Sequence, residues 1–156
     1  MGNWDAELLK TELSANGIVR VRLLGTSMGP FIKNGDMAII KKIEIKDIHI
    51  GDVILYHIGE DFFTHRVFKK GNSFLTLKAD AVTGVDRYVS FEEVMGKVVA
   101  IEKKNRILDL QSSKWRIINY FILFYSLGLS TLRDCRKDFI VPILSRLGSL
   151  SHNYRG

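Results

Sequence analysis

The sequence predicts a mainly β domain, compact and coiled, with one helix before it and a helical tail after it. Short runs of alternating apolar and polar residues recur along the first two thirds of the chain, and glycine-containing turns separate them. Short strands at such spacing are typical of a small coiled sheet. The last third is instead apolar, aromatic and basic. With 156 residues, the chain suits one domain plus an appendage.

The first predicted element is an amphipathic helix over Trp4–Ala15. We expect Leu8, Leu9 and Leu13 on its apolar face, and Asn16-Gly17 is its stop signal. One short helical turn is expected near residues 91–94. The predicted strands are Ile18–Leu24, Met37–Lys42, Val53–His57, Phe62–Lys69, Phe74–Lys78 and Lys97–Lys103. The pattern leaves open whether Arg106–Leu110 is a further strand.

The predicted domain boundary lies at residues 109–113, between a β-domain over 1–110 and a helical tail over 111–156. Charge follows the same division. Residues 1–100 hold 13 Lys and Arg against 13 Asp and Glu, whereas residues 101–156 hold 10 against 4, so the whole net charge of +6 lies in the last third. The single cysteine, Cys135, excludes an internal disulfide.

A turn after the first predicted strand carries the most informative residues, Gly25-Thr26-Ser27-Met28-Gly29-Pro30. Gly25 can adopt backbone angles closed to other residues, and Pro30 fixes the chain beyond the turn. A serine presented in this way can reach a substrate carbonyl. Serine in a glycine-rich turn is, however, most often only a turn residue. Asp36 and Asp52, which both follow glycines, are expected to form turns.

Histidine and aspartate follow the serine in later strands. His65 lies 38 residues after Ser27 within a predicted strand, and Asp80 and Asp86 come after the next one. Acyl transfer needs an oxygen nucleophile, a base with a pKa near neutrality and a carboxylate that orients the imidazole. The chain supplies these three chemistries in order, although spacing alone does not bring side chains together.

Five short motifs in this order resemble the type I signal peptidases. The resemblance is closer to the branch that uses histidine in place of lysine, which comprises archaeal, endoplasmic-reticulum and SipW-like enzymes. The resemblance covers roughly residues 18–103. Its motifs are Ser27-Met28-Gly29-Pro30 with Gly35-Asp36, Gly51-Asp52-Val53, His65-Arg66-Val67, Lys78-Ala79-Asp80 with Asp86, and Gly96-Lys97-Val98. The resemblance implies a β-domain of the signal peptidase/LexA type and a serine endopeptidase that cleaves leader or signal-type peptides.

The resemblance also implies the role of each site residue. Ser27 attacks the peptide carbonyl, and His65 transfers its proton. Asp86 orients His65 with Asp80 close by, and which of the two aspartates orients the imidazole stays open. Gly25 stands where some relatives have a hydroxyl that binds the oxyanion, so backbone N–H groups around Ser27 would take that role.

Other departures from the family pattern concern structure. Ala79 replaces the usual glycine before Asp80. Family members normally have a transmembrane helix before the serine, and the sequence has none there. Lys41 and Lys42 could suggest a serine–lysine dyad, but they precede the Gly51-Asp52 motif, whereas the family's base lies beyond it.

Two alternative functions stay open. One is a catalytically silent peptide-binding module that docks on a membrane partner, and the presence of serine, histidine and two aspartates argues against it. The other is a LexA-like self-cleaving regulator, for which the 17 residues before the first strand leave no room for a helix-turn-helix. We expect no cofactor and no metal, because His49, His57 and His152 lack metal-ligand spacing.

The tail predicts contact with a membrane. Its apolar, aromatic segment Ile117–Leu132 has 16 residues, below the lower limit of about 17 for a membrane span. Basic residues flank this segment, which favours an anionic lipid surface. We expect residues 114–146 to lie in the interface on the cytoplasmic face, with a single span or a packed helix pair as alternatives. Nucleic-acid binders interleave basic and aromatic residues, so no nucleic-acid partner is expected.

Overall fold

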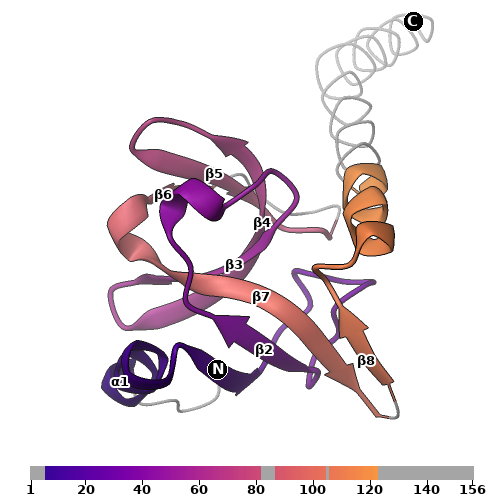
Figure 1. Cartoon of the computed structure of the whole chain (residues 1–156), viewed down its shortest axis with the longest axis horizontal. Helices are drawn as coiled ribbons and strands as arrows, with labels where there is room; N and C mark the ends of the chain where they lie inside the picture. Colours follow the sequence, from indigo (N-terminus) through magenta and orange to yellow (C-terminus); the bar gives the residue numbers. More distant parts are fainter. Residues whose placement is uncertain (1–5, 82–86, 105, 123–156) are drawn as a thin grey trace, which may run out of the picture.

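The computed structural model describes residues 6–81, 87–104 and 106–122, and it confirms a mainly β fold with a helix in front (Figure 1). The elements are α1 (Ala6–Asn16), β1 (Ile18–Arg22), β2 (Met37–Lys41), η1 (Ile45–Asp47), β3 (Val53–Ile58), β4 (Asp61–Lys70), β5 (Phe74–Lys78), β6 (Arg87–Ser90), η2 (Phe91–Glu93), β7 (Val94–Lys103) and β8 (Arg106–Asp109). A further helix, named helix 113–122 below, follows β8.

The sheet is antiparallel, and β7 lies at its centre (Figure 1). Its strand order is β1-β2-β7-β3-β4-β5-β6, and β8 pairs with β7 outside this path. The register shifts at three places, between β2 and β7, between β3 and β7 and between β4 and β5. Such bulges bend strands and increase their twist, which coils the sheet. A side chain at Gly96 would lie 2.7 Å from the carbonyl oxygen of Lys41, so glycine permits the close approach of β7 to β2.

The coiled sheet encloses two apolar clusters. β3 contributes to both, because successive side chains of a strand point to opposite faces. Val53 and Leu55 belong to the first cluster, which also contains residues of α1, β1, β2 and β7, and Ile54 and Tyr56 belong to the second, with residues of β4, β5 and β6. The β3–β4 hairpin therefore lies between two cores and is fixed from both sides.

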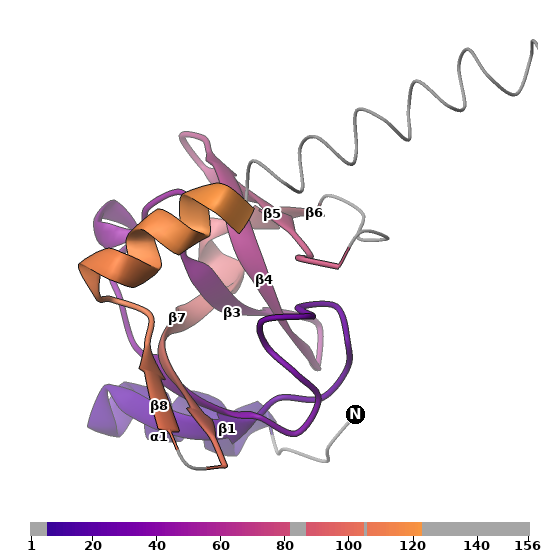
Figure 2. The ribbon, with the colours of Figure 1, turned by 90° about the vertical axis from the view of Figure 1, so that its right-hand side faces the viewer.

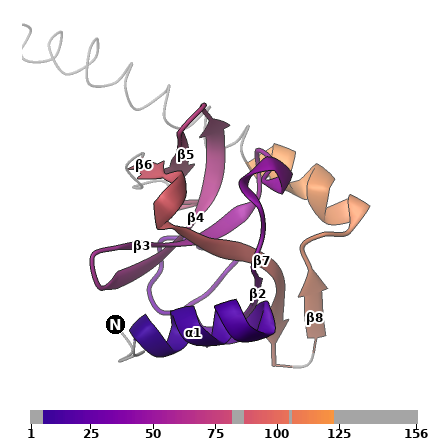
Figure 3. The same ribbon diagram turned by 60° about the vertical axis from the view of Figure 1, so that its left-hand side comes forward.

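Helix α1 covers the first cluster (Figure 3). Leu9 and Leu13 lie one turn apart and are both 3% exposed. Leu8, expected on the same face, is 57% exposed, so that expectation is wrong. Adjacent helical residues differ by about 100° around the axis, which turns Leu8 away from the sheet. The helix ends at Gly17 as predicted, with a φ of 69° and an N–H that donates to the carbonyl of Leu13.

The strand predictions are confirmed for β1 to β5, β7 and β8, and β6 was not foreseen. β6 has four residues, and only Val89 among them is buried. One buried residue gives no alternation to recognise, and the strand forms because it pairs with β5. The predicted turns also form. The carboxylate of Asp36 accepts from the N–H of Lys33, and that of Asp52 accepts from the N–H of His49.

Helix 113–122 packs on the β-domain through its inner face (Figure 2). Trp115 packs against the first cluster, and its ring meets that of Phe31 edge to face, with 6.4 Å between centroids. Asn119 and Ile122 are buried as well. The described part of the predicted tail is therefore attached to the β-domain, while the rest of the apolar segment lies outside the described residues. None of the described helices combines the length and apolar character needed to cross a membrane.

Candidate active site

Ser27 is exposed in the loop between β1 and β2. Two backbone hydrogen bonds close the base of this loop, because Leu23 donates to Asp36 and accepts from Gly35. The next residue, Met28, is 5% exposed and belongs to the first apolar cluster. The buried methionine thus anchors the turn, while the serine beside it stays at the surface. Gly25 has a φ of 101°, in the left-handed region that favours glycine, as the sequence predicted.

His65 lies on β4, directly opposite Ile54 of β3. Its ring is half-buried at the second cluster, and its Nδ1 lies 2.9 Å from the hydroxyl oxygen of Tyr56. Burial lowers the pKa of His65 below its ordinary value of 6.5, the positive charge of Arg87 lowers it further, and the negative charge of Asp80 opposes both. The lowered pKa favours the neutral imidazole, which is the form that can accept a proton.

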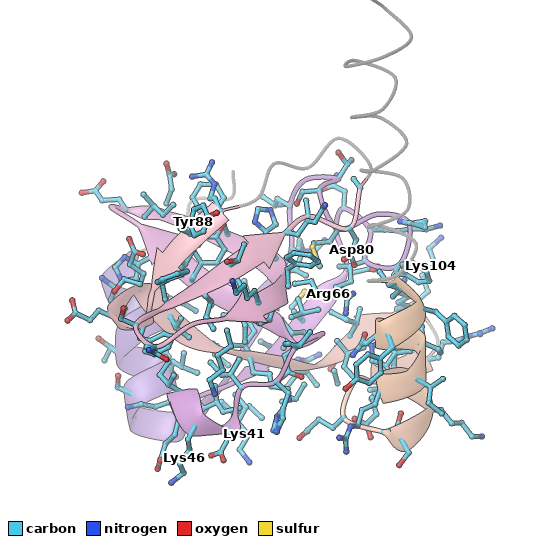
Figure 4. All side chains as sticks on the ribbon, turned by 90° about the horizontal axis from the view of Figure 1, so that it is seen from above. Lys41, Lys46, Arg66, Asp80, Tyr88 and Lys104 are labelled. Carbon is cyan, nitrogen blue, oxygen red and sulfur yellow. The ribbon has the colours of Figure 1, made fainter. Side chains whose placement is uncertain are left out.

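Asp80 follows β5 and binds Arg66, the neighbour of His65 on β4 (Figure 4). Both carboxylate oxygens accept hydrogen bonds, from Nε at 2.7 Å and from Nη2 at 2.6 Å. Nη1 of Arg66 also donates to the carbonyl of Gly51 and to Oδ1 of Asn119. The pair is almost fully buried, with side-chain exposures of 2% and 3%. Asp80 and Arg66 thus form a buried, bidentate ion pair.

A backbone hydrogen bond brings the serine loop to the aspartate. The N–H of Ala81, directly after Asp80, donates to the carbonyl of Ser27 at 2.9 Å. Arg66 therefore connects β4, which carries His65, to the segment that holds the Ser27 turn. Within the described part of the chain, no hydrogen bond joins the Ser27 hydroxyl to His65, and none joins Asp80 to His65. Asp86, the other predicted carboxylate, lies outside the described residues.

Three residues of this region were not predicted as site residues: Arg66, Tyr56 and Asn119. Arg66 stands inside the His-Arg-Val motif, where its position beside His65 was the available signal. Asn119 is an isolated amide within an apolar helical segment, which is a pattern that often marks a buried hydrogen bond. In the sequence, Tyr56 looks like an ordinary strand residue of the core. Only the pairing of β3 with β4 shows that its hydroxyl lies beside His65.

Lys41 and Lys42, the alternative base, lie apart from the predicted site. Lys41 and Lys42 are exposed at the end of β2, and Figure 4 places Lys41 beside Lys46, away from Arg66 and Asp80. Among the described residues there is no group of three or more His, Cys, Asp or Glu side chains that could hold a metal ion.

A family match covers the segment that carries the predicted site residues. Residues 4–99 match the model of the family described as Peptidase S24-like, a segment that contains Ser27, His65, Asp80 and Asp86. No curated protein matches the chain. The match confirms placement in the LexA/signal peptidase superfamily and supports a serine protease of that general type. The chain belongs to the Peptidase S24-like family.

Proposed function

We propose that this protein is a serine endopeptidase that cleaves leader or signal-type peptides, with Ser27 as nucleophile and His65 as general base. The observation that carries the proposal is the hydrogen bond from Ala81 to the carbonyl of Ser27. It holds an exposed serine turn against the segment bound to Arg66, the neighbour of a half-buried histidine whose lowered pKa favours the neutral form.

The proposed reaction begins with attack by the Ser27 hydroxyl on a peptide carbonyl, as His65 takes the hydroxyl proton. His65 then gives that proton to the leaving amine as the C–N bond breaks. In the second half, His65 takes a proton from a water that attacks the acyl carbon, and gives it to the Ser27 oxygen as the ester bond breaks. Backbone N–H groups around Ser27 supply the oxyanion site, since Gly25 offers no side chain. Asp86 is the proposed carboxylate that stabilises the charged imidazole, because Asp80 is already bound to Arg66.

The substrate class is tested in cells rather than with a single peptide. Peptides that accumulate uncleaved in cells carrying Ser27→Ala, compared with cells carrying the unchanged protein, would identify the precursors and their cleavage sites. We expect extended segments with small residues before the cut. An identical set of peptides in both cells would contradict the proposal and favour a catalytically silent binding module.

The pH dependence of cleavage is expected to follow His65. Burial lowers the pKa of His65 from its ordinary value of 6.5, so the acid limb of kcat/KM should have its midpoint below pH 6.5, where the imidazole becomes protonated. The same lowered pKa makes the folded state bind fewer protons than the unfolded chain. Stability should therefore also decline as the pH falls below 6.5. An acid limb centred above pH 6.5 would show that another group controls the rate.

We further infer that helix 113–122 contacts an anionic membrane through its outer face. Ile117, Tyr120 and Phe121 are 60%, 62% and 72% exposed there. Lys114 and Arg116 are exposed on the same helix. Burying such side chains in a lipid interface contributes about 1.5–3 kcal/mol each, and the basic residues add attraction to anionic headgroups.

This inference predicts binding of the full chain to vesicles that contain anionic lipid, weaker binding to neutral vesicles, and weakening by high salt. The double substitution Tyr120→Ser with Phe121→Ser should reduce vesicle binding at least about tenfold. The matched control is Ile107→Ser on β8, which removes an apolar side chain that is 66% exposed elsewhere. Equal binding by both variants would indicate that this face of the helix does not touch lipid.

A further inference from the structure

Tyr56 is the direct partner of His65, and packing fixes it in that position. The residue is 0% exposed on β3, and its ring stacks on that of Phe63 with 5.7 Å between centroids and 28° between planes. The centroid of the His65 ring lies 5.8 Å from that of Tyr56, with 48° between the two planes. The Tyr56 hydroxyl meets Nδ1 of His65 at 2.9 Å. A stacked aromatic ring inside a core holds its hydroxyl more precisely than a loop side chain could.

The hydrogen bond at Nδ1 decides what Nε2 can do. Neutral imidazole carries one proton, so one ring nitrogen donates and the other accepts. If the Tyr56 hydroxyl donated to Nδ1, the proton would reside on Nε2, and Nε2 could not take a proton from serine. If Nδ1–H donates to the hydroxyl oxygen, Nε2 keeps its lone pair. Only the second arrangement makes His65 a base at Nε2.

The charged groups around this pair are compatible with the second arrangement. Burial raises the pKa of Tyr56 to about 12, with Arg87 opposing the rise and Glu93 adding to it, so the hydroxyl stays neutral during turnover. Arg87 and Asp80 are the charges that act on His65. Both oxygens of Asp80 accept from Arg66, and among the described residues no carboxylate binds His65.

We propose that Tyr56 is a positioning residue of this peptidase: its hydroxyl oxygen accepts a hydrogen bond from Nδ1–H of His65 and keeps Nε2 free to act as the base. The catalytic role of Tyr56 rests on the proposed function, because it requires His65 to act as the base. The proposal gives the tyrosine the position that an orienting aspartate takes in a Ser-His-Asp triad.

The test is the tautomer of His65, read from ring nitrogen shifts in the full chain labelled with ¹⁵N-histidine. Loss of one signal set in His65→Ala assigns the resonances among the four histidines. The unchanged protein should carry its proton on Nδ1. Tyr56→Phe keeps the stacked ring but removes the acceptor, so the proton should move to Nε2 rather than stay as a buried, unpaired N–H. The matched control, Tyr88→Phe, removes a hydroxyl from a tyrosine that is 73% exposed and should leave the tautomer unchanged.

The kinetic arm separates failure of this proposal from failure of the proposed function. Tyr56→Phe should lower kcat about 10²-fold with little change in KM, at the lower end of what a positioned base contributes. A proton on Nε2 in the unchanged protein, or a tautomer that Tyr56→Phe does not alter, overturns the role of Tyr56 whether or not the protein cleaves peptides. Full cleavage by Ser27→Ala instead overturns the proposed function and leaves the tautomer result intact.

Discussion

Ser27→Ala is expected to reduce peptide cleavage by about 10⁴-fold or more while the domain stays folded. The hydroxyl is exposed and makes no hydrogen bond within the described part of the chain, so its removal leaves no buried group unpaired. His65→Ala should have an effect of similar size on kcat. Because nucleophile and base act as a unit, the double variant should lose little more than either single variant.

The measurement is kcat/KM on a peptide recovered from the cellular comparison, together with the urea midpoint of each variant. Ser73→Ala is the matched control for the serine, because it also removes an exposed hydroxyl from a loop between two strands. His57→Ala is the control for the histidine, since His57 is a half-buried residue of the neighbouring strand β3. Additive losses in the double variant would indicate that serine and histidine act in separate steps.

Arg66→Met is expected to cause the largest loss of stability, about 3–5 kcal/mol in the free energy of unfolding. The substitution leaves the Asp80 carboxylate, whose side chain is 3% exposed, without its charged partner. It also removes the donors to Gly51 and Asn119. Part of the loss should be recovered when Asp80→Asn is added, because the amide carries no charge to desolvate.

The matched control for this loss is Arg20→Met. Arg20 pairs with Glu102 at the surface, where the two side chains are 63% and 26% exposed. Exposed pairs of this kind contribute about 0–1 kcal/mol. Urea unfolding with an unchanged m-value provides the comparison. If Arg66→Met and Arg20→Met lowered the free energy of unfolding by the same small amount, the buried Arg66 network would not be a main source of stability.

Local patterns gave the fold and only part of the site. β3 and β4 are short runs rich in β-branched and aromatic residues between glycine-containing turns. The turns at Asp36 and Asp52 depend on carboxylates that accept from backbone N–H groups three residues earlier, so sequence was enough to place these elements. The orientation of Leu8 and the existence of β6 depend on what packs against them, which a single segment does not reveal.

The site shows the same division between local and distant effects. The Ser27 turn and the strand of His65 were predictable because each motif is contiguous. The roles of their neighbours were not, because the hydrogen bond between Tyr56 and His65 depends on strand register, and the one from Arg66 to Asn119 spans 53 positions of sequence. In addition, each oxygen of the Asp80 carboxylate accepts a hydrogen bond from Arg66, whereas the motif alone left this carboxylate available to the histidine.

The position of Asn119 has a consequence for biosynthesis. Arg66, Asp80 and Gly51 are all made well before residue 119, yet the guanidinium group reaches its full set of partners only when helix 113–122 docks. A nascent chain that has exposed only the family-matched segment, residues 4–99, still lacks the amide that closes this buried network. The β-domain can therefore complete this buried network only after Asn119 has been synthesised, later than all of its strands.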